Sequence, residues 1–348
     1  MLRKLALLPL VALVIGACGG AAQPSPSATT AATAAPSKAA ATATPKPAPT
    51  KLVVGFSEIY QGSLPMWYAA EKGIFAKNGL DVTLQYTSSS TGVAALISGN
   101  TQIFQGGGSE TLSADAQGAD LVVVGNIVPI YPYVFMSPAD IKTVADLKGK
   151  KVGASSVGST SDIATRVGLA KEGIDPDKDV TMVYVGSSSN RTAALLNNSI
   201  QGGLDQPPGS LQLEAKGLHV LFNEVDEKLP VVNNGIVVQR SFMTAHKDAV
   251  QAYVDSIVEA IAALRKDKEG GVAVLTKEMK IADAKIAAST YDFSMKIFPN
   301  IPLISADAFK DSVTVLSKKN PKIAQFDVNK IIDNTFMKSA SDRGLDKK

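Results

Sequence analysis

The chain has 348 residues and a formal net charge of +3, and its 35 basic residues are dispersed along the sequence. This small, scattered charge excludes the basic face that nucleic-acid binding or docking on an anionic membrane requires. Hydrophobic residues make up 45% of the chain. The part after residue 50 is near the size at which a single core splits into two.

The first 18 residues are typical of a secretory signal that ends in a lipidated cysteine. Arg3 and Lys4 precede an apolar run, residues 5–17, that is too short to span a bilayer. Residues 15–18, Ile-Gly-Ala-Cys, resemble the bacterial lipobox, in which the cysteine becomes the first mature residue and carries acyl chains. Cys18 is the only cysteine, which agrees with export without disulfides. The alternative is an ordinary signal peptide that contains a cysteine.

Residues 19–50 have the composition of a disordered linker. They are almost entirely Ala, Pro, Thr, Ser, Gly, Gln and Lys, with no aromatic residue and no aliphatic one larger than alanine, so they cannot bury enough apolar surface to fold. A glycosylated or wall-spanning stalk would give the same topology. We therefore expect a globular body from residue 51 onward, outside the cytoplasmic membrane and lipid-anchored to it, in the periplasm or on the outer face.

Several segments of this body recur in order. Residues 54–57 (VGFS) return at an offset of 98 as residues 152–155 (VGAS), and residues 81–86 return as residues 179–184. Residues 88–96 return as residues 187–195, where the extra Gly186 accounts for an offset of 99, and Gln105 corresponds to Gln206. The pattern predicts two copies of one structural unit.

Each copy alternates short β-rich runs with helical patterns. We expect strands at residues 52–56, 82–86, 103–105, 121–125, 151–154 and 180–185, and helices at residues 64–77, 92–98, 161–171 and 192–198. Such alternation favours an α/β fold with two lobes, each a mainly parallel sheet flanked by helices. In such sheets ligands bind beyond the carboxyl ends of the strands, so two facing lobes would form a cleft there.

Three loops at these strand ends are rich in serine and glycine, namely residues 57–63, 105–109 and 155–161. Glycines allow a close approach of the backbone, and the free N–H groups at helix starts favour anions or carbonyl oxygens. The alternative is that these residues only cap helices and form turns. Arg191 can pair with a carboxylate or sulfonate or be a solvated side chain, and Trp67 can stack on a ligand or lie in the core.

A search for catalytic chemistry finds little. His219 and His246 lie far apart in sequence and outside these loops, and neither has ligand-like spacing to a carboxylate. Gly106–Gly108 lack the lysine and hydroxyl residue of a phosphate loop, and no nucleophile elbow or zinc signature is present. We expect no catalytic residue, no metal and no cofactor.

Four segments carry a resemblance to a known family: VVGFSEIYQGSLPMWYAAEKGIFAKNGLDVTL, ALISGNTQIFQGGGSETLSADAQGADLVVV, DLKGKKVGASSVGST and ALLNNSIQGGLDQPP. With them the chain resembles the ABC-importer substrate-binding lipoproteins that bind sulfonates, nitrate and thiamine precursors. The resemblance covers residues 52 to about 240 and implies the type 2 periplasmic binding fold. The expected division is a signal peptide at 1–18, a linker at 19–50, lobe 1 at 51–130 and 235–348, and lobe 2 at 131–234.

The resemblance also implies which residues contact the solute, because family members use the same three loops. The glycine run at residues 106–108 departs from the hydroxyl-bearing pattern of many relatives and puts a sulfonate ligand in doubt. Pyrimidines, flavin-like rings, aromatic acids and nitrate-like anions stay open as ligands. The candidate ligand-binding residues, including Arg191 and Trp67 from the reasoning above, are Ser57, Gln61, Gly62, Trp67, Gly107, Ser109, Ser155, Gly158, Ser159, Thr160, Arg191 and Gln206.

The C-terminal third is expected to be a scaffold. Apolar residues at positions 250, 254, 257, 261 and 264 form one stripe of a helix, and Asp255, Glu259 and Arg265 should face solvent. Crossovers between the lobes are expected near residues 127–135 and 229–238, where Asn233 and Asn234 occur among apolar residues.

The expected function is that of an extracytoplasmic solute-binding lipoprotein. The family resemblance implies a monomer that delivers a small organic or anionic solute to an ABC permease and its ATPase by closing its lobes around it. Two alternatives stay open. One is an enzyme of the same fold, similar to pyrimidine synthases, and the other is a sensor that reports the solute to a histidine kinase.

Overall fold

A computed structural model describes residues 48–347. The predictions on the signal peptide, on Cys18 and on all but the end of the linker lie outside the described residues. No helix within residues 48–347 combines the length and apolar character that crossing a membrane requires.

The first of two sheets has five strands in the order β2-β1-β3-β10-β4. Strands β1 (Thr50–Phe56), β2 (Leu80–Tyr86) and β3 (Ile103–Gly106) run parallel, whereas β10 (Gly235–Gln239) is antiparallel to both β3 and β4 (Leu121–Asn126). Four strands therefore run in one direction. The antiparallel strand is β10, with which the chain returns to this sheet after forming the second one.

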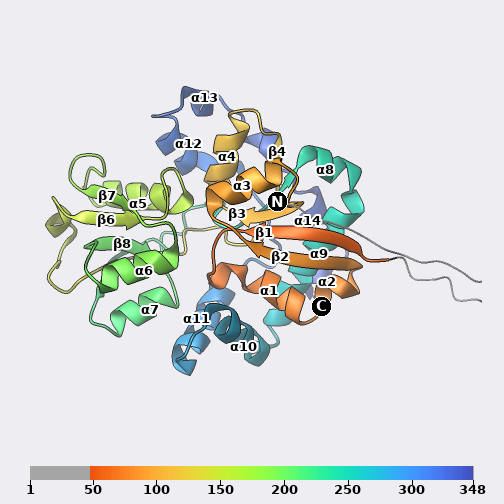
Figure 1. The fold of residues 1–348 in the computed structure, drawn as a ribbon, viewed down its shortest axis with the longest axis horizontal. Coiled ribbons are helices and arrows are strands. Elements are labelled where there is room, and N and C mark those ends of the chain that lie inside the picture. Colours follow the sequence, from red (N-terminus) through yellow and green to blue (C-terminus); the bar gives the residue numbers. More distant parts are fainter. Residues whose placement is uncertain (1–47, 348) are drawn as a thin grey trace, which may run out of the picture. The chain divides into compact units, whose positions relative to one another are not determined.

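The second sheet repeats this order as β7-β6-β8-β5-β9 (Figure 1). Its parallel strands are β6 (Lys151–Ala154), β7 (Thr181–Tyr184) and β8 (Gly202–Asp205), and β5 (Val134–Ser137) is antiparallel to β8 and to β9 (His219–Asn223). The two-copy prediction and the two-lobed α/β fold are thereby confirmed.

The strand registers correct one detail of the repeat. Gly55 lies opposite Phe104 in the first sheet, and its counterpart Gly153 lies opposite Gly203 in the second. Phe104 and Gly203 are therefore equivalent, which makes Leu204 the counterpart of Gln105. The pairing of Gln105 with Gln206 is wrong.

Helices cover both faces of each sheet. The first lobe has α1 (Leu64–Glu71), α2 (Ile74–Lys77), α3 (Ser89–Ile97) and α4 (Gly108–Asp115), and the second has α5 (Thr160–Lys171), α6 (Ser188–Leu196) and α7 (Gly209–Glu214). The helix expected over residues 64–77 is interrupted at Gly73, whose φ of 68° lies in the left-handed region that glycine adopts without strain.

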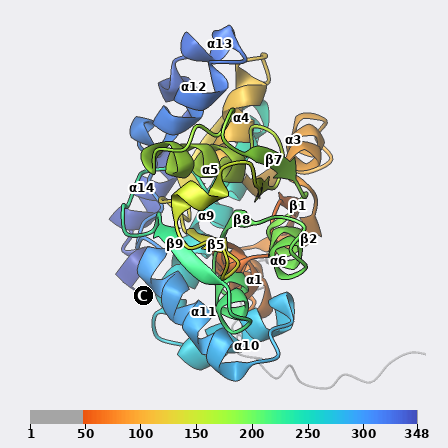
Figure 2. The same ribbon diagram turned by 90° about the vertical axis from the view of Figure 1, so that its left-hand side faces the viewer.

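The C-terminal helices complete the first lobe. They are α8 (Arg240–Ala245), α9 (Lys247–Leu264), α10 (Lys268–Met279), α11 (Ala284–Ile297), α12 (Lys310–Leu316), α13 (Pro321–Ala324) and α14 (Thr335–Asp342). Helices α9, α10, α11 and α14 contribute to the core on one face of the first sheet, and the segment from Ile304 to Ile331 contributes to the core on the other. Figure 2 shows α12 and α13 at one end of this lobe and α10 and α11 at the other.

Helix α9 confirms the apolar stripe and corrects its polar face. The five stripe residues are fully buried. Asp255 and Glu259, expected to be solvated, are also buried, at 9% and 8% exposure. Each binds a cation from another element: Arg343 pairs with Asp255, and Lys77 lies 3.0 Å from Glu259. Arg265 is exposed, as expected.

Two crossover segments join the lobes and run side by side. The backbone N–H of Ile127 donates to the carbonyl of Asn234 at 2.8 Å, and that of Val231 donates to the carbonyl of Pro129 at 3.0 Å. An antiparallel bridge between Ile130 and Pro230 extends this pairing. These segments lie within the expected crossover regions, and such paired connections are the usual position of hinges between lobes.

Candidate functional site

A cavity lies between the lobes, at the carboxyl ends of strands from both sheets. Residues that directly follow β1, β6 and β8 line it, and the first turns of α4, α5 and α6 face it. The lining from the first lobe is Ser57, Glu58, Tyr60, Gly107 and Glu110, the crossovers add Tyr133 and Asn233, and the second lobe adds Ser155, Ser159, Thr160, Ser161, Ser188, Arg191 and Gln206.

Hydrogen bonds join the two lobes directly around this cavity. The Ser109 hydroxyl lies 3.1 Å from the hydroxyl of Thr160, and the Ser188 hydroxyl donates to Oε2 of Glu58 at 2.9 Å. The cavity volume is about 30 Å³, room for roughly two water molecules. We therefore expect a larger group to enter after these bonds between the lobes part.

Glu58 is held by groups of the second lobe. Its Oε2 also accepts the backbone N–H of Ser188 at 3.4 Å, so the carboxyl group of one lobe caps the start of α6 in the other. Burial raises the pKa of Glu58, and the negative charge of Glu110 adds to this rise, whereas Arg191 and the hydrogen bonds from Ser188 oppose it. Both carboxyl groups belong to the first lobe and line the same cavity.

Arg191 is buried with only 1% of its surface exposed. Its NH1 donates to the Ser155 hydroxyl at 3.1 Å, and its Nε donates to the carbonyl of Leu204. Burial raises the pKa of the nearby Asp205, and Arg191 opposes that rise. The solvated alternative for Arg191 is wrong, because the side chain is buried. Its guanidinium donates hydrogen bonds to residues at the ends of two strands of the second sheet.

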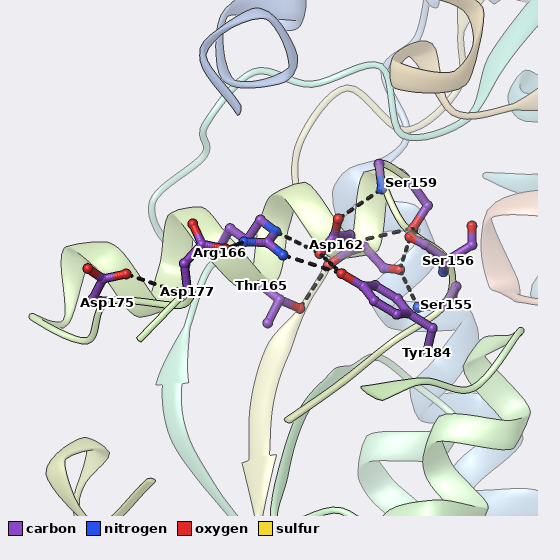
Figure 3. A network of polar contacts seen from close by, with 11 residues as sticks. Ser155, Ser156, Ser159, Asp162, Thr165, Arg166, Asp175, Asp177 and Tyr184 are labelled. Atoms are coloured by element: carbon purple, nitrogen blue, oxygen red, sulfur yellow. Dashed lines mark hydrogen bonds and ion pairs between the residues drawn. The ribbon is translucent and has the colours of Figure 1, made fainter. Parts of the chain in front are cut away.

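A polar network fixes the serine-rich loop at the start of α5 (Figure 3). The Ser159 side chain caps the helix by accepting the N–H of Asp162 at 3.3 Å, and Ser161 accepts the N–H of Ser155 at 3.0 Å. Asp162 accepts from the N–H of Gly158 at 2.8 Å and from Nε of Arg166 at 2.9 Å. Ser159 therefore caps a helix, as the alternative interpretation of these serines expects, and it also lines the cavity.

The crossovers contribute a chain of hydrogen bonds to the cavity wall. The Tyr133 hydroxyl donates to Oδ1 of Asn233 at 2.9 Å, and Nδ2 of Asn233 donates to the Tyr60 hydroxyl at 3.4 Å. Burial raises the pKa of both tyrosines, so they stay protonated donors at neutral pH. Asn234 donates to the carbonyl of Gly62 at 2.9 Å and so ties the crossover to the loop after β1.

Seven of the candidate residues line this cavity, and five do not. Ser57, Gly107, Ser155, Ser159, Thr160, Arg191 and Gln206 lie along the wall. Ser109 contacts Thr160 without lining the cavity, Gln61 and Gly62 are buried in a 3-10 turn of the loop after β1, and Gly158 lines a separate groove between α5 and α12. Trp67 packs in the core of the first lobe, edge-on to Phe56 with ring centroids 6.2 Å apart.

Two carboxyl groups of the wall, Glu58 and Glu110, were not among the candidates. Glu58 comes two residues after the end of β1, and Glu110 lies in the first turn of α4. Their positions at strand ends were a usable signal, since that is where an α/β sheet places its ligand. Within residues 48–347, no group of three or more His, Cys, Asp or Glu side chains is arranged to hold a metal ion.

Comparison with known proteins agrees with this geometry. The family model described as "NMT1/THI5 like" matches residues 61–270, which is more than half of the chain. The protein belongs to the NMT1/THI5-like family. The riboflavin-binding protein RibY of Chloroflexus aurantiacus is 25% identical over 276 residues, covering 75% of this chain and 74% of RibY.

Other relatives in the comparison include solved structures and an enzyme. A Bordetella bronchiseptica structure superposes with a TM-score of 0.74 at 21% identity, covering 85% of this chain and 98% of that one. The periplasmic aliphatic sulphonate binding protein SsuA of Escherichia coli gives 0.67 at 24%, covering 82% and 92%. A pyrimidine phosphate synthase of Schizosaccharomyces pombe is 28% identical, but over only 40% of each chain. The structures show the periplasmic binding fold.

Proposed function

We propose that this protein is an extracytoplasmic solute-binding protein that delivers a small solute to an ABC importer. The observation that carries the proposal is a polar cavity lined from both lobes, at the strand ends of two sheets with the same order. Family membership and the names of RibY and SsuA support it. The two lobes would rotate about the paired crossovers, with lobe 1 formed by residues 51–130 and 235–348 and lobe 2 by residues 131–234. Solute binding would shift the population toward the closed form.

Membrane attachment through Cys18 belongs to the same proposal. More than one acyl chain gives stable anchoring, and the linker would let the lobes reach a permease and its ATPase. Replacing Cys18 with serine should move the protein from the membrane fraction to the medium or periplasm. Retention of Cys18→Ser in the membrane fraction would contradict lipidation.

Solute binding is tested by thermal unfolding of the purified full chain with riboflavin, ethanesulfonate and nitrate in turn. A bound solute raises the melting temperature by mass action. Gly107→Val is the matched variant, because a Cβ at Gly107 would strike Thr160 and Glu110. It should remain folded and lose any shift. An unchanged shift in this variant would place binding elsewhere.

An enzyme of the same fold is the second candidate, because the partial match to the S. pombe synthase favours it. Mass spectrometry of each bound solute after incubation separates the two. Recovery of unchanged solute supports transport, whereas a product would support catalysis. A gene for a histidine kinase beside this one, without permease and ATPase genes, would favour a sensor.

A further inference from the structure

The charged side chains in the wall of the interlobe cavity are two carboxyl groups and one guanidinium group. Glu58 and Glu110 contribute two carboxyl groups from the first lobe. Arg191 is the one cation in the lining, and it already donates to Ser155 and Leu204. The remaining charge is therefore negative, and an anionic solute would face repulsion from both carboxylates.

Gln206 adds a second, independent observation. This residue follows β8, lines the cavity and is 4% exposed, yet its Oε1 has no hydrogen-bond partner among the described residues. A buried carbonyl oxygen without a partner carries a free-energy cost that a solute N–H or O–H would remove. Gln206 therefore points to a donor on the solute.

A neighbouring cavity adds apolar side chains to a partly polar lining. It has a volume of about 340 Å³ and shares Tyr60, Ser188 and Gln206 with the polar cavity. Ile59 and Leu196 line it from the two lobes, and they are 45% and 47% exposed. Large aliphatic side chains exposed on both sides of a cleft are suited to holding an apolar body.

From these contacts we propose that the solute has two parts: a head of N–H donors, neutral or cationic, and an apolar body. The head lies against Glu58, Glu110 and Gln206, and the body lies between Ile59 and Leu196. This inference rests on the proposed solute-binding function and names its substrate class. It disfavours sulfonates and nitrate, because two carboxyl groups line the cavity beside a single guanidinium, two of whose N–H donors are already engaged.

Four probes that share one ring test the head group. Benzamidine and benzamide carry N–H donors, whereas benzoate and benzenesulfonate are anions. Isothermal titration of the full chain should give at least tenfold tighter binding of benzamidine than of benzoate, with benzamide between them. Tighter binding of either anion, or no binding of any probe at millimolar concentration, would overturn the inference.

Charge-removing variants locate the effect. Glu58→Gln with Glu110→Gln should reduce the preference for benzamidine over benzoate to less than threefold. Glu214→Gln, an exposed site at the end of α7, is the matched control and should keep the full preference. If the double variant keeps it as well, the inference fails. If ethanesulfonate binds the wild type and Gly107→Val abolishes that binding, the donor-head inference alone is overturned. If none of the tested solutes binds, the proposed transport function is overturned as well.

Discussion

Asp115 at the end of α4 is a buried carboxyl group whose ionisation opposes folding. It is 8% exposed, and its Oδ1 accepts the N–H of Leu121 at 2.8 Å, whereas its Oδ2 has no partner among the described residues. Burial raises the pKa of Asp115 to about 6, and the negative charge of Asp120 adds to this rise. The hydrogen bond from Leu121 and the positive charge of Arg240 both oppose it.

The raised pKa predicts how stability depends on pH. The folded state holds the Asp115 proton more tightly than the unfolded state, so the cost of ionising it is absent below about pH 4 and complete above about pH 6. Relative to Asp115→Asn, the wild type should lose up to about 3 kcal/mol of unfolding free energy across this range. Urea unfolding of both proteins at several pH values measures this loss. Parallel pH profiles would contradict the prediction.

Single residues also show where sequence reasoning was limited. The serine and glycine loops were identified because strand ends and helix starts have recognisable composition. Whether a given side chain faces the cavity depends on its direction, which composition does not contain. Trp67 therefore could not be assigned from sequence, and it packs in the core. Glu58 was not among the candidates, and its partner, Ser188, is 130 residues away in the sequence.

Among the elements, α5 shows how a helix start positions part of the site. Asp162 is 2% exposed and accepts from Gly158, Arg166 and the Tyr184 hydroxyl, the last at 3.3 Å. One carboxyl group therefore joins the cavity loop to the helix and to β7. A neutral amide at this position keeps the size of the side chain but loses the charge-assisted bonds.

Asp162→Asn should therefore destabilise the protein by about 1–3 kcal/mol and loosen residues 155–161. Denaturant unfolding measures the free energy, and hydrogen exchange of the loop amides measures the loosening. Asp177→Asn is the matched control, since Asp177 binds the same arginine from a side chain that is 58% exposed. Its cost should stay below about 1 kcal/mol. Equal costs for the two variants would show that the loop does not depend on Asp162.

Helix α9 shows what the spacing of apolar residues can and cannot predict about a helix. Its apolar stripe follows from the spacing of residues 250–264, because a helix must bury one face. The same pattern assigned Asp255 to solvent, and its partner Arg343 lies 88 residues further along the chain. Periodicity identifies the face that packs on the sheet, but it does not show what a later segment places on the other face.

For the whole molecule, the internal repeat predicted the two lobes, and the sheet orders confirm them. The repeat could not predict how the lobes meet, because the groups that touch come from unlike positions of the two copies. Ser109 follows β3, whereas its partner Thr160 follows β6, and the two hydroxyls meet beside the cavity. Contacts of this kind decide whether a solute must open the cleft before it binds.

A reversible crosslink between the lobes tests that requirement. The side-chain oxygens of Ser109 and Thr160 are 3.1 Å apart, so cysteines at these positions lie within reach of a disulfide. The change is Ser109→Cys with Thr160→Cys in a Cys18→Ser background, where no other thiol competes. Oxidation should pin the lobes together and prevent both uptake and release of solute.

Stopped-flow binding of benzamidine, or of any solute that gives a thermal shift, measures the effect. The oxidised protein should bind at least tenfold more slowly than the reduced one, because the polar cavity of about 30 Å³ admits a head group only after the lobes separate. Reduction with dithiothreitol should restore the rate, and each single-cysteine variant should be insensitive to oxidation. Equal rates for the oxidised and reduced protein would mean that the solute reaches its site without separating the lobes, which would contradict closure around the solute as the mechanism of capture.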